Sequence, residues 1–331
     1  MTVAPDPQLL DSRLRGLVPV DQPLLLISQA QRSGGTLLLR LLDGHPQCHV
    51  APFQLRGIDE AAKRAPSRPE QAWQALYDPK LAQRFECGHR QLKHDVLRHD
   101  EVFPFELPPP LQRAIYDACT GRIGDPTARD LVSCYFTSYF NAWLDYRNLR
   151  TGSKCWVVGF EPGVARSMRR RRAVQSLYPD GKIVTIVRDP WSWFASARRW
   201  EGRWSDREVA LNHWCDVGKG TFKLRKRYKA DLRILRFEDL LANTEETLRR
   251  LVGWLGIDFR PELLQPTFNG SPIRANTSYG DVGTTVSTLP LERWRDELTD
   301  DDVAYIQERA GEIYRTLANK AGKDWEASPG G

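Results

Sequence analysis

Four short apolar runs recur along the chain of 331 residues, and longer helical patterns separate them. The runs are PLLLIS, CWVVGF, KIVTIVR and LRILRF, at residues 23–28, 155–160, 182–188 and 232–237. Near-continuous apolar runs of this length are typical of parallel strands that are covered on both faces. The helical patterns span residues 35–43, 111–147 with breaks, 164–177, 191–199, 207–228, 244–255 and about 299–317. The sequence therefore predicts an α/β fold, with a parallel sheet flanked by helices.

The segment from Gln54 to Asp130 breaks this alternation. It is rich in Pro, Arg and His and shows no clear strand, so we interpret it as a mostly helical insertion over the mouth of a site. With 41% hydrophobic residues, the chain can bury one large core or two modest ones. We expect a single domain over residues 1–331, in which residues 54–150 form an insertion on the acceptor side.

The sequence shows no secretory signal at its N-terminus and no membrane span. The first residues lack a charged start followed by a long apolar run, and no window reaches the length of a membrane span. We therefore expect a soluble, cytoplasmic protein. Six cysteines without a CxxC pair argue against a disulfide framework and a structural zinc site, and favour reduced thiols.

A net charge of +6 and a pI near 9.0 fit an anionic ligand or a nucleic acid. The densest basic runs, Arg166–Ala173 and Lys223–Lys229, are flanked by acids and by apolar residues at helical spacing. Such runs are typical of solvated helix faces. We therefore expect neither a nucleic acid nor a membrane as a partner, and a homodimer stays open.

The stretch QRSGGT follows the first apolar run and precedes the helical pattern TLLLRLLDG. Ligands of open α/β sheets bind at the carboxyl ends of strands, and small residues there let backbone N–H groups turn toward an anion. Arg32 supplies a cation, and Ser33 and Thr36 supply hydroxyl groups. No lysine precedes Thr36, so the pattern of a nucleoside triphosphatase is absent and no metal-bound triphosphate is implied. A tight Gly-Gly turn with an incidental arginine is the plain alternative.

A second candidate anion site follows the third run. Arg188 ends that run, Asp189 and Pro190 begin a helix, and Ser196 lies about two turns further on. An arginine and a serine at this spacing can hold a phosphate through a charge-assisted fork and a hydroxyl. A helix cap beside an exposed arginine is the alternative.

These motifs resemble those of the sulfotransferases that use 3′-phosphoadenosine 5′-phosphosulfate (PAPS). QRSGGTLLLRLLDGHPQ resembles their 5′-phosphosulfate loop, and VRDPWSWFASA resembles their 3′-phosphate motif. LRFEDLLANTEETLRRLVGWLGI and RANTSYGD resemble a later strand with its helix and a closing loop. The resemblance implies a three-layer fold like that of P-loop NTPases, no metal, and sulfuryl transfer from PAPS to a hydroxyl or an amine.

The same resemblance suggests which residues contact the nucleotide. Residues 32–37 (Arg32, Ser33, Gly34, Gly35, Thr36 and Leu37) would bind the 5′-phosphosulfate, and Arg188 with Ser196 would bind the 3′-phosphate. Arg32 would also neutralise the leaving oxygen during catalysis. Phe237 stands where relatives often have an aromatic residue near the nucleotide, although we interpret it as core.

The general base is less clear from the sequence. Gln54 stands where many relatives carry a glutamate, and an amide cannot take a proton at neutral pH. His49 and Glu161 are our first candidates, because imidazole has a suitable pKa and Glu161 follows a strand at the productive edge. His94 ranks next, His45 is interpreted as structural, and an acceptor that ionises without help stays open.

Two other classes of function remain at this point. A small-molecule kinase would need a loop lysine and acidic metal ligands, for which Glu238 and Asp239 are the candidates. A non-catalytic nucleotide-binding protein is favoured by Gln54. We expect a small hydroxylated metabolite or a sugar as the acceptor. The many aromatics between Trp73 and Trp143 either line its pocket or pack together.

Overall fold

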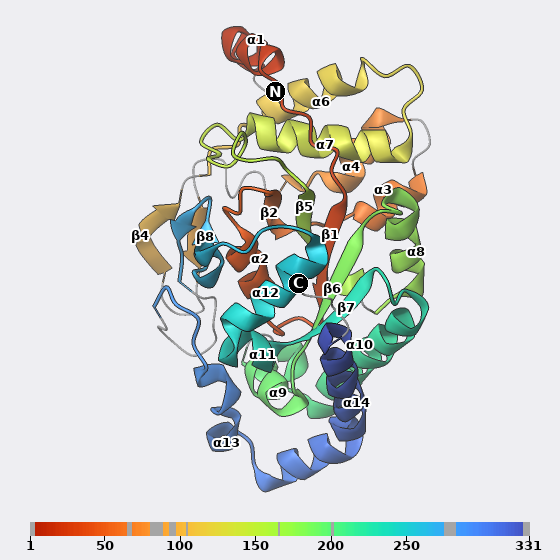
Figure 1. Ribbon diagram of the computed structural model, residues 1–331, viewed down its shortest axis with the longest axis vertical. Helices are drawn as coiled ribbons and strands as arrows, with labels where there is room; N and C mark the ends of the chain where they lie inside the picture. Colours follow the sequence, from red (N-terminus) through yellow and green to blue (C-terminus); the bar gives the residue numbers. More distant parts are fainter. Residues whose placement is uncertain are drawn as a thin grey trace.

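The computed structural model describes residues 4–64, 68–79, 89–92, 97–103, 105–164, 166–199, 202–274 and 283–326. Its centre is a five-stranded parallel sheet with the strand order β2-β5-β1-β6-β7 (Figure 1). The strands are β1 (Leu24–Gln29), β2 (Cys48–Gln54), β5 (Trp156–Phe160), β6 (Lys182–Val187) and β7 (Leu232–Arg236). The predicted α/β fold is confirmed, and four of these strands lie where the apolar runs placed them.

The fifth strand, β2, was not predicted. It lies at the edge of the sheet beside β5, and its register shifts between Val50 and Gln54. Pro52 lies within this shift. A proline is tolerated on an edge strand because the N–H that it lacks is not needed by a second neighbour. The proline and His49 interrupt the apolar pattern, so the sequence gives no clear strand signal here.

Each strand of the sheet contributes side chains to two hydrophobic cores. On β1, Leu24 and Leu26 belong to one hydrophobic cluster, whereas Leu25 and Ile27 belong to the other. Because side chains alternate between the two faces of a strand, this division shows that both faces of the sheet are covered. The smaller core lies under α2, α11 and α12, and the larger lies under α7, α8, α9, α10 and α14.

The predicted helices lie close to their expected positions, whereas α1, α11 and α13 were not predicted. They are α1 (Pro7–Arg15), α2 (Gly35–Leu42), α3 (Ile58–Arg64), α4 (Pro69–Leu76), α6 (Pro109–Thr120), α7 (Ala128–Ala142), α8 (Met168–Leu177), α9 (Pro190–Arg198), α10 (Arg207–Arg227), α11 (Phe237–Ala242), α12 (Thr244–Leu255), α13 (Trp294–Glu297) and α14 (Asp300–Glu326). The last helix runs beyond its predicted end. A buried ion pair holds this extension, with Arg225 Nε donating to Asp324 Oδ1 at 2.7 Å. None of the described helices is both long enough and apolar enough to cross a lipid bilayer.

The insertion is helical, as expected, with one exception. It contains α3, α4, α6 and α7, and α6 and α7 lie together at the end of the molecule opposite α9 and α14 (Figure 1). The exception is an antiparallel pair of strands, β3 (His89–Leu92) and β4 (Leu97–Phe103). Their polar residues gave no strand signal, because a two-stranded pair needs no apolar run.

The cysteines also differ from the expectation of reduced thiols. Cys119 and Cys134 form a disulfide that joins α6 to α7, with 5.7 Å between their Cα atoms. The two cysteines are 15 residues apart. Only the antiparallel packing of the two helices brings them together. Cys48, Cys155 and Cys215 are free.

Candidate active site

The loop after β1 turns sharply into α2. Arg32 and Gly34 both have left-handed backbone conformations, with φ angles of 71° and 95°. The side-chain oxygen of Gln29 accepts a hydrogen bond from the N–H of Gly35 and so holds the start of the helix. Left-handed residues in a turn direct successive N–H groups to one side, and the first N–H groups of a helix have no intrahelical partner. The loop and the first turn of α2 therefore form a cradle for an anion.

Two aromatic rings leave no room for side chains in this loop. A Cβ atom on Gly34 would lie 2.4 Å from the Phe237 ring, and one on Gly35 would lie 2.5 Å from the Phe160 ring. Gly34 also needs its positive φ, which other residues adopt only with strain. Phe237 is buried in the smaller core, as interpreted from the sequence, but it also contacts the loop.

Ser33 lies inside the cradle. Its side chain is 1% exposed, and its hydroxyl has no hydrogen-bond partner among the described residues. A buried polar group without a partner costs about 1 to 3 kcal/mol. A phosphate or sulfate oxygen in the cradle would accept this hydrogen bond, so the residues present fit an oxyanion.

Arg188 connects the second candidate anion site to the first. Its guanidinium donates to the carbonyl of Arg32 at 3.0 Å and to the carbonyl of Pro290 at 3.3 Å. It also lies over the Phe237 ring, 4.5 Å from the ring centroid. β1 and β6 are neighbours, and their onward connections run to opposite sides of the sheet. Ligands of open α/β sheets bind at this switch point.

Helix α9 begins immediately after Arg188. Asp189 caps the helix by accepting from the N–H of Ser192 at 2.8 Å, and Ser192 accepts from Nε of Arg188 at 2.9 Å. Ser196 is buried one turn beyond Ser192, on the same face of the helix. The arginine and both serines therefore lie on one side of α9. The late loop RANTSYGD lies outside the described residues after Arg274.

Glu161 follows β5 at the same edge of the sheet. Its carboxylate accepts from the N–H of Gly163 at 3.0 Å and from Nη1 of Arg170 at 3.4 Å. Its other oxygen accepts from Nε2 of Gln54 at 3.1 Å. Each carboxylate oxygen offers two lone pairs, so this second oxygen can accept one further hydrogen bond. Gln54, which stands where a glutamate was expected, thus lies beside a carboxylate from the neighbouring strand.

His49 lies far from this edge. It is near the amino end of β2, is fully buried and stacks on Phe140 with 4.9 Å between ring centroids. Burial, together with the charge of Lys154, lowers the pKa of His49 to about 3. This placement argues against the role of base that the sequence suggested, because parallel strands put their catalytic edge at the carboxyl end.

His45, the other histidine considered from the sequence that lies among the described residues, is bound to the backbone. Nε2 of His45 lies 2.8 Å from the carbonyl of Asp258, which agrees with its structural interpretation. His94 lies outside the described residues.

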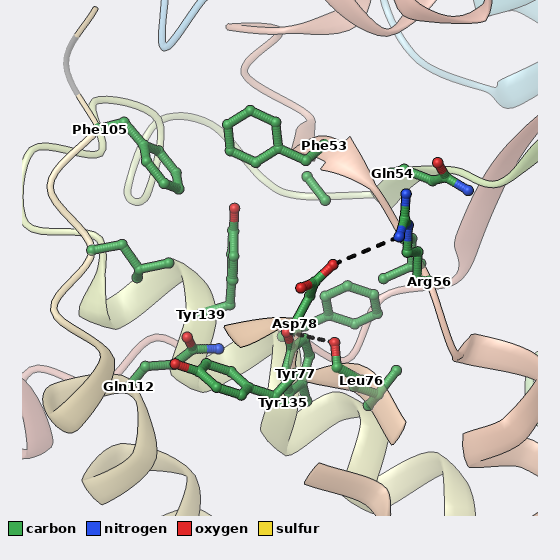
Figure 2. Close-up of a pocket in the computed structure, with 14 residues that line it drawn as sticks. Phe53, Gln54, Arg56, Leu76, Tyr77, Asp78, Phe105, Gln112, Tyr135 and Tyr139 are labelled. Atoms are coloured by element: carbon green, nitrogen blue, oxygen red, sulfur yellow. Dashed lines mark hydrogen bonds and ion pairs between the residues drawn. The ribbon is translucent and has the colours of Figure 1, made fainter. Parts of the chain in front are cut away.

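A pocket that is partly open to solvent lies between β2, α4, α6 and α7. Gln54 lines it, so the pocket adjoins Glu161. Six aromatic side chains form much of its wall (Figure 2): Phe53, Tyr77, Phe105, Tyr135, Phe136 and Tyr139. The aromatics of the insertion therefore form two groups, those that line the pocket and those that only pack in the core. The second group comprises Trp73, Tyr116, Phe140 and Trp143.

Sequence reasoning missed Gln112, which also lines this pocket. It is 1% exposed and lies on the buried side of α6, together with Leu111, Ile115 and Tyr116. A polar residue within the apolar stripe of a helix was the available signal. It could not be interpreted without knowing what the stripe faces.

The carboxylates considered as metal ligands are engaged by the protein. Glu238 accepts from the N–H of Asp189 at 2.8 Å and from the hydroxyl of Tyr314 at 3.1 Å. Burial, together with the charge of Asp189, raises the pKa of Glu238 to about 7. Asp239 pairs with Arg236 at 3.5 Å. The described residues contain no group of three or more His, Cys, Asp or Glu that could hold a metal ion.

Comparison with known proteins extends these observations. The sulfotransferase domain from the Synechococcus PCC 7002 olefin synthase is 18% identical, with a TM-score of 0.55 over 91% of this chain and 96% of that domain. The sulfotransferase domain from the curacin biosynthetic pathway is 15% identical, with a TM-score of 0.50 over 88% of this chain and 98% of that domain. These likenesses concern the fold alone. No curated protein sequence matches the chain.

A sequence model described as the sulfotransferase family matches residues 23–261. The match begins just before β1 and ends after α12, and so includes the loop after β1, Glu161 and Arg188. Because the match covers well over half of the chain, the chain belongs to the sulfotransferase family.

Proposed function

We propose that this protein transfers a sulfuryl group from PAPS to a hydroxyl group, or an amine, of a small-molecule or carbohydrate acceptor. Family membership supports sulfuryl transfer in general. The observation that carries the choice of donor is the hydrogen bond of 3.0 Å between Arg188 and the carbonyl of Arg32. It joins two cationic sites at one sheet edge, as a nucleotide with phosphates at two positions requires.

The donor would span both sites. Ser33, Thr36 and the N–H groups at the start of α2 would hold the 5′-phosphosulfate. Arg188 and Ser196 would hold the 3′-phosphate through a charge-assisted hydrogen bond and a hydroxyl. A nucleotide without the 3′-phosphate should therefore bind more weakly.

In the transfer step, the acceptor oxygen attacks sulfur and forms the new S–O bond. The bond between sulfur and the bridging phosphate oxygen breaks, and that oxygen keeps the electron pair on the leaving bisphosphorylated adenosine. The acceptor proton passes to Glu161, at the oxygen that already accepts from Gln54. Arg32 stabilises the charge that develops on the leaving oxygen.

A non-catalytic nucleotide-binding protein is the alternative that Gln54 favours. The hydrogen bond between Gln54 and Glu161 weakens that argument, because it puts a carboxylate beside the position where the base was missing. A kinase is disfavoured because the loop has no lysine and Glu238 is held by backbone and tyrosine donors.

Two measurements test the proposal. Calorimetry without magnesium should show that bisphosphorylated adenosine binds, and that it binds more tightly than ATP with magnesium. Radiolabelled PAPS is then incubated with a panel of phenols, alcohols, sugars and amines. Labelled product is the expected result. Nucleotide binding without transfer to any class would favour the non-catalytic alternative, and a preference for ATP would contradict PAPS as the donor.

A further inference from the structure

The loop after β1 begins with a tight turn at residues 30–33. The N–H of Ser33 donates to the carbonyl of Ala30 at 3.2 Å and closes the turn. Of the two central residues, only Arg32 has a positive φ, of 71°. This combination defines a type II turn, in which a glycine or an asparagine usually occupies the position of Arg32. Such a strained backbone persists only where the surrounding structure holds it.

Two side chains from α9 and α10 hold the other central residue, Gln31. The indole N–H of Trp193 donates to the carbonyl of Gln31 at 2.7 Å, and Nε2 of His213 lies 2.9 Å from the side-chain oxygen of Gln31. The rings of Trp193 and His213 stack on each other, with 6.3 Å between their centroids. Trp193 is fully buried, so packing fixes the direction of its N–H. It therefore holds the peptide bond between Gln31 and Arg32 in one orientation.

The orientation of this peptide bond matters to an anion in the cradle. The C=O and N–H groups of a trans peptide point in opposite directions. Trp193 belongs to the larger core, whereas α2 packs on the smaller core, on the other face of the sheet. The carbonyl of Gln31 therefore points toward α9, away from the side on which α2 lies. Rotation of this one peptide would give a type I turn, which suits an arginine, and would turn the carbonyl oxygen toward the cradle.

We propose that Trp193 is a positioning residue for the sulfuryl donor. Its indole N–H keeps the turn in the type II conformation, in which the loop can accept the 5′-phosphate group. Arg188 assists by donating to the carbonyl of Arg32. The inference rests on the proposed function, because the donor supplies the anion in the cradle. It assigns part of donor binding to a buried residue that acts only through the backbone of the loop.

The test measures how much the 5′-phosphate contributes to binding. Calorimetry gives the dissociation constants of adenosine 3′,5′-bisphosphate and adenosine 3′-phosphate, and their ratio is the preference for the 5′-phosphate. Trp193→Phe keeps an aromatic ring but removes the N–H that donates to Gln31. Trp191→Phe is the matched control, because the Trp191 indole on the same helix donates to the carbonyl of Val303 at 3.3 Å. Since the ratio compares two ligands of one variant, it does not depend on how stable that variant is.

Trp193→Phe should lower the preference about tenfold, as expected when about one hydrogen bond to a charged group is lost. Trp191→Phe should leave the preference unchanged. Trp193→Phe is then combined with Arg32→Gly, because glycine adopts a positive φ without strain. In that background the turn no longer needs Trp193, so Trp193→Phe should lower the preference by no more than about twofold. A tryptophan that only packs in the core would give the same loss in both backgrounds.

The outcomes separate this inference from the proposed function. An unchanged preference in Trp193→Phe overturns the inference, as does an equal loss in Trp191→Phe or an equal loss with and without Arg32→Gly. If the preference changes as expected but no acceptor is sulfated, the inference stands and the proposed transfer fails alone. If sulfate is transferred but the losses are equal, the inference fails alone. If neither adenosine nucleotide binds to the intact protein, both proposals are wrong.

Discussion

The two halves of the candidate site are built in different ways. On the proposed nucleotide side, at the ends of β1, β6 and β7, the anion cradle consists of backbone N–H groups and of motifs contiguous in sequence. On the proposed acceptor side, at the ends of β2 and β5, Glu161, Gln54 and Gln112 come from three separate segments. Backbone geometry constrains sequence tightly, because only certain residues fit it. A side-chain pocket can be formed by many residue combinations.

This contrast predicts how substitutions will act. Changes on the nucleotide side should alter donor binding or charge stabilisation for every acceptor. Changes on the acceptor side should alter proton removal or acceptor choice while leaving the nucleotide in place.

Glu161→Gln should have the largest effect. If this carboxylate takes the acceptor proton, turnover should fall by a factor of about a hundred to ten thousand, with little change in nucleotide affinity. Single-turnover rates and calorimetry give the two quantities. Asp59→Asn is the matched control, because Asp59 also pairs with Arg170, at 3.6 Å. Equal losses in both variants would assign the effect to Arg170 and remove Glu161 as the base.

Arg32→Ala should come next. Turnover should fall by about a hundredfold to a thousandfold, because one preorganised donor to the leaving oxygen is lost. Affinity for PAPS should change little, and Arg32→Lys should recover part of the rate since a point charge survives. Rates at saturating PAPS are compared with those of Arg15→Ala, an exposed arginine of α1. A wild-type rate in Arg32→Ala would exclude this residue from the mechanism.

Arg188→Ala and Ser196→Ala should weaken nucleotide binding. Losing a hydrogen bond to a charged group costs about 1.5 to 3 kcal/mol, or roughly a tenfold to hundredfold change in the dissociation constant. The loss should be seen with 3′-phosphorylated nucleotides and be small with adenosine 5′-phosphate. Calorimetry measures both, with the exposed Arg249→Ala as control. Equal losses for the two ligands would place the 3′-phosphate elsewhere.

Gly34→Ala should weaken both folding and nucleotide binding. Its φ of 95° and the Phe237 ring together oppose a Cβ atom, and such backbone strain costs about 1 to 3 kcal/mol. Gly253→Ala is the control, because nothing lies near its Cβ position within α12 and alanine should stabilise that helix by about 0.5 to 1 kcal/mol. Chemical denaturation and calorimetry should therefore separate the two glycines. If the two variants had similar stability and nucleotide affinity, the claim that the loop has no room for a side chain at Gly34 would be wrong.

His49→Phe should have the smallest effect on turnover, since the residue lies in the core. It should instead change the pH dependence of stability. The pKa of His49 is about 3 when folded and near 6.5 when unfolded, so between these values only the unfolded chain binds the proton. This favours unfolding, and the free energy of unfolding should fall by about 1.4 kcal/mol per pH unit well below 6.5.

The variant should lose that part of the slope, which denaturation between about pH 4 and 6 measures. A large drop in turnover, with an unchanged pH dependence of the free energy of unfolding, would instead support His49 as the general base.

The sequence by itself determined the fold class, four of the five strands of the sheet and the two candidate phosphate sites. Buried parallel strands need continuous apolar runs, and a tight anion loop needs glycines with small polar neighbours, so both leave local signals. The edge strand β2, the disulfide between Cys119 and Cys134, and the removal of His49 from the catalytic edge were decided by tertiary structure. Each depends on which distant segment lies opposite, and no local pattern carries that information. The same holds for Gln54, which bonds to Glu161 and lines one pocket with Gln112 only when β2, β5 and α6 are packed together.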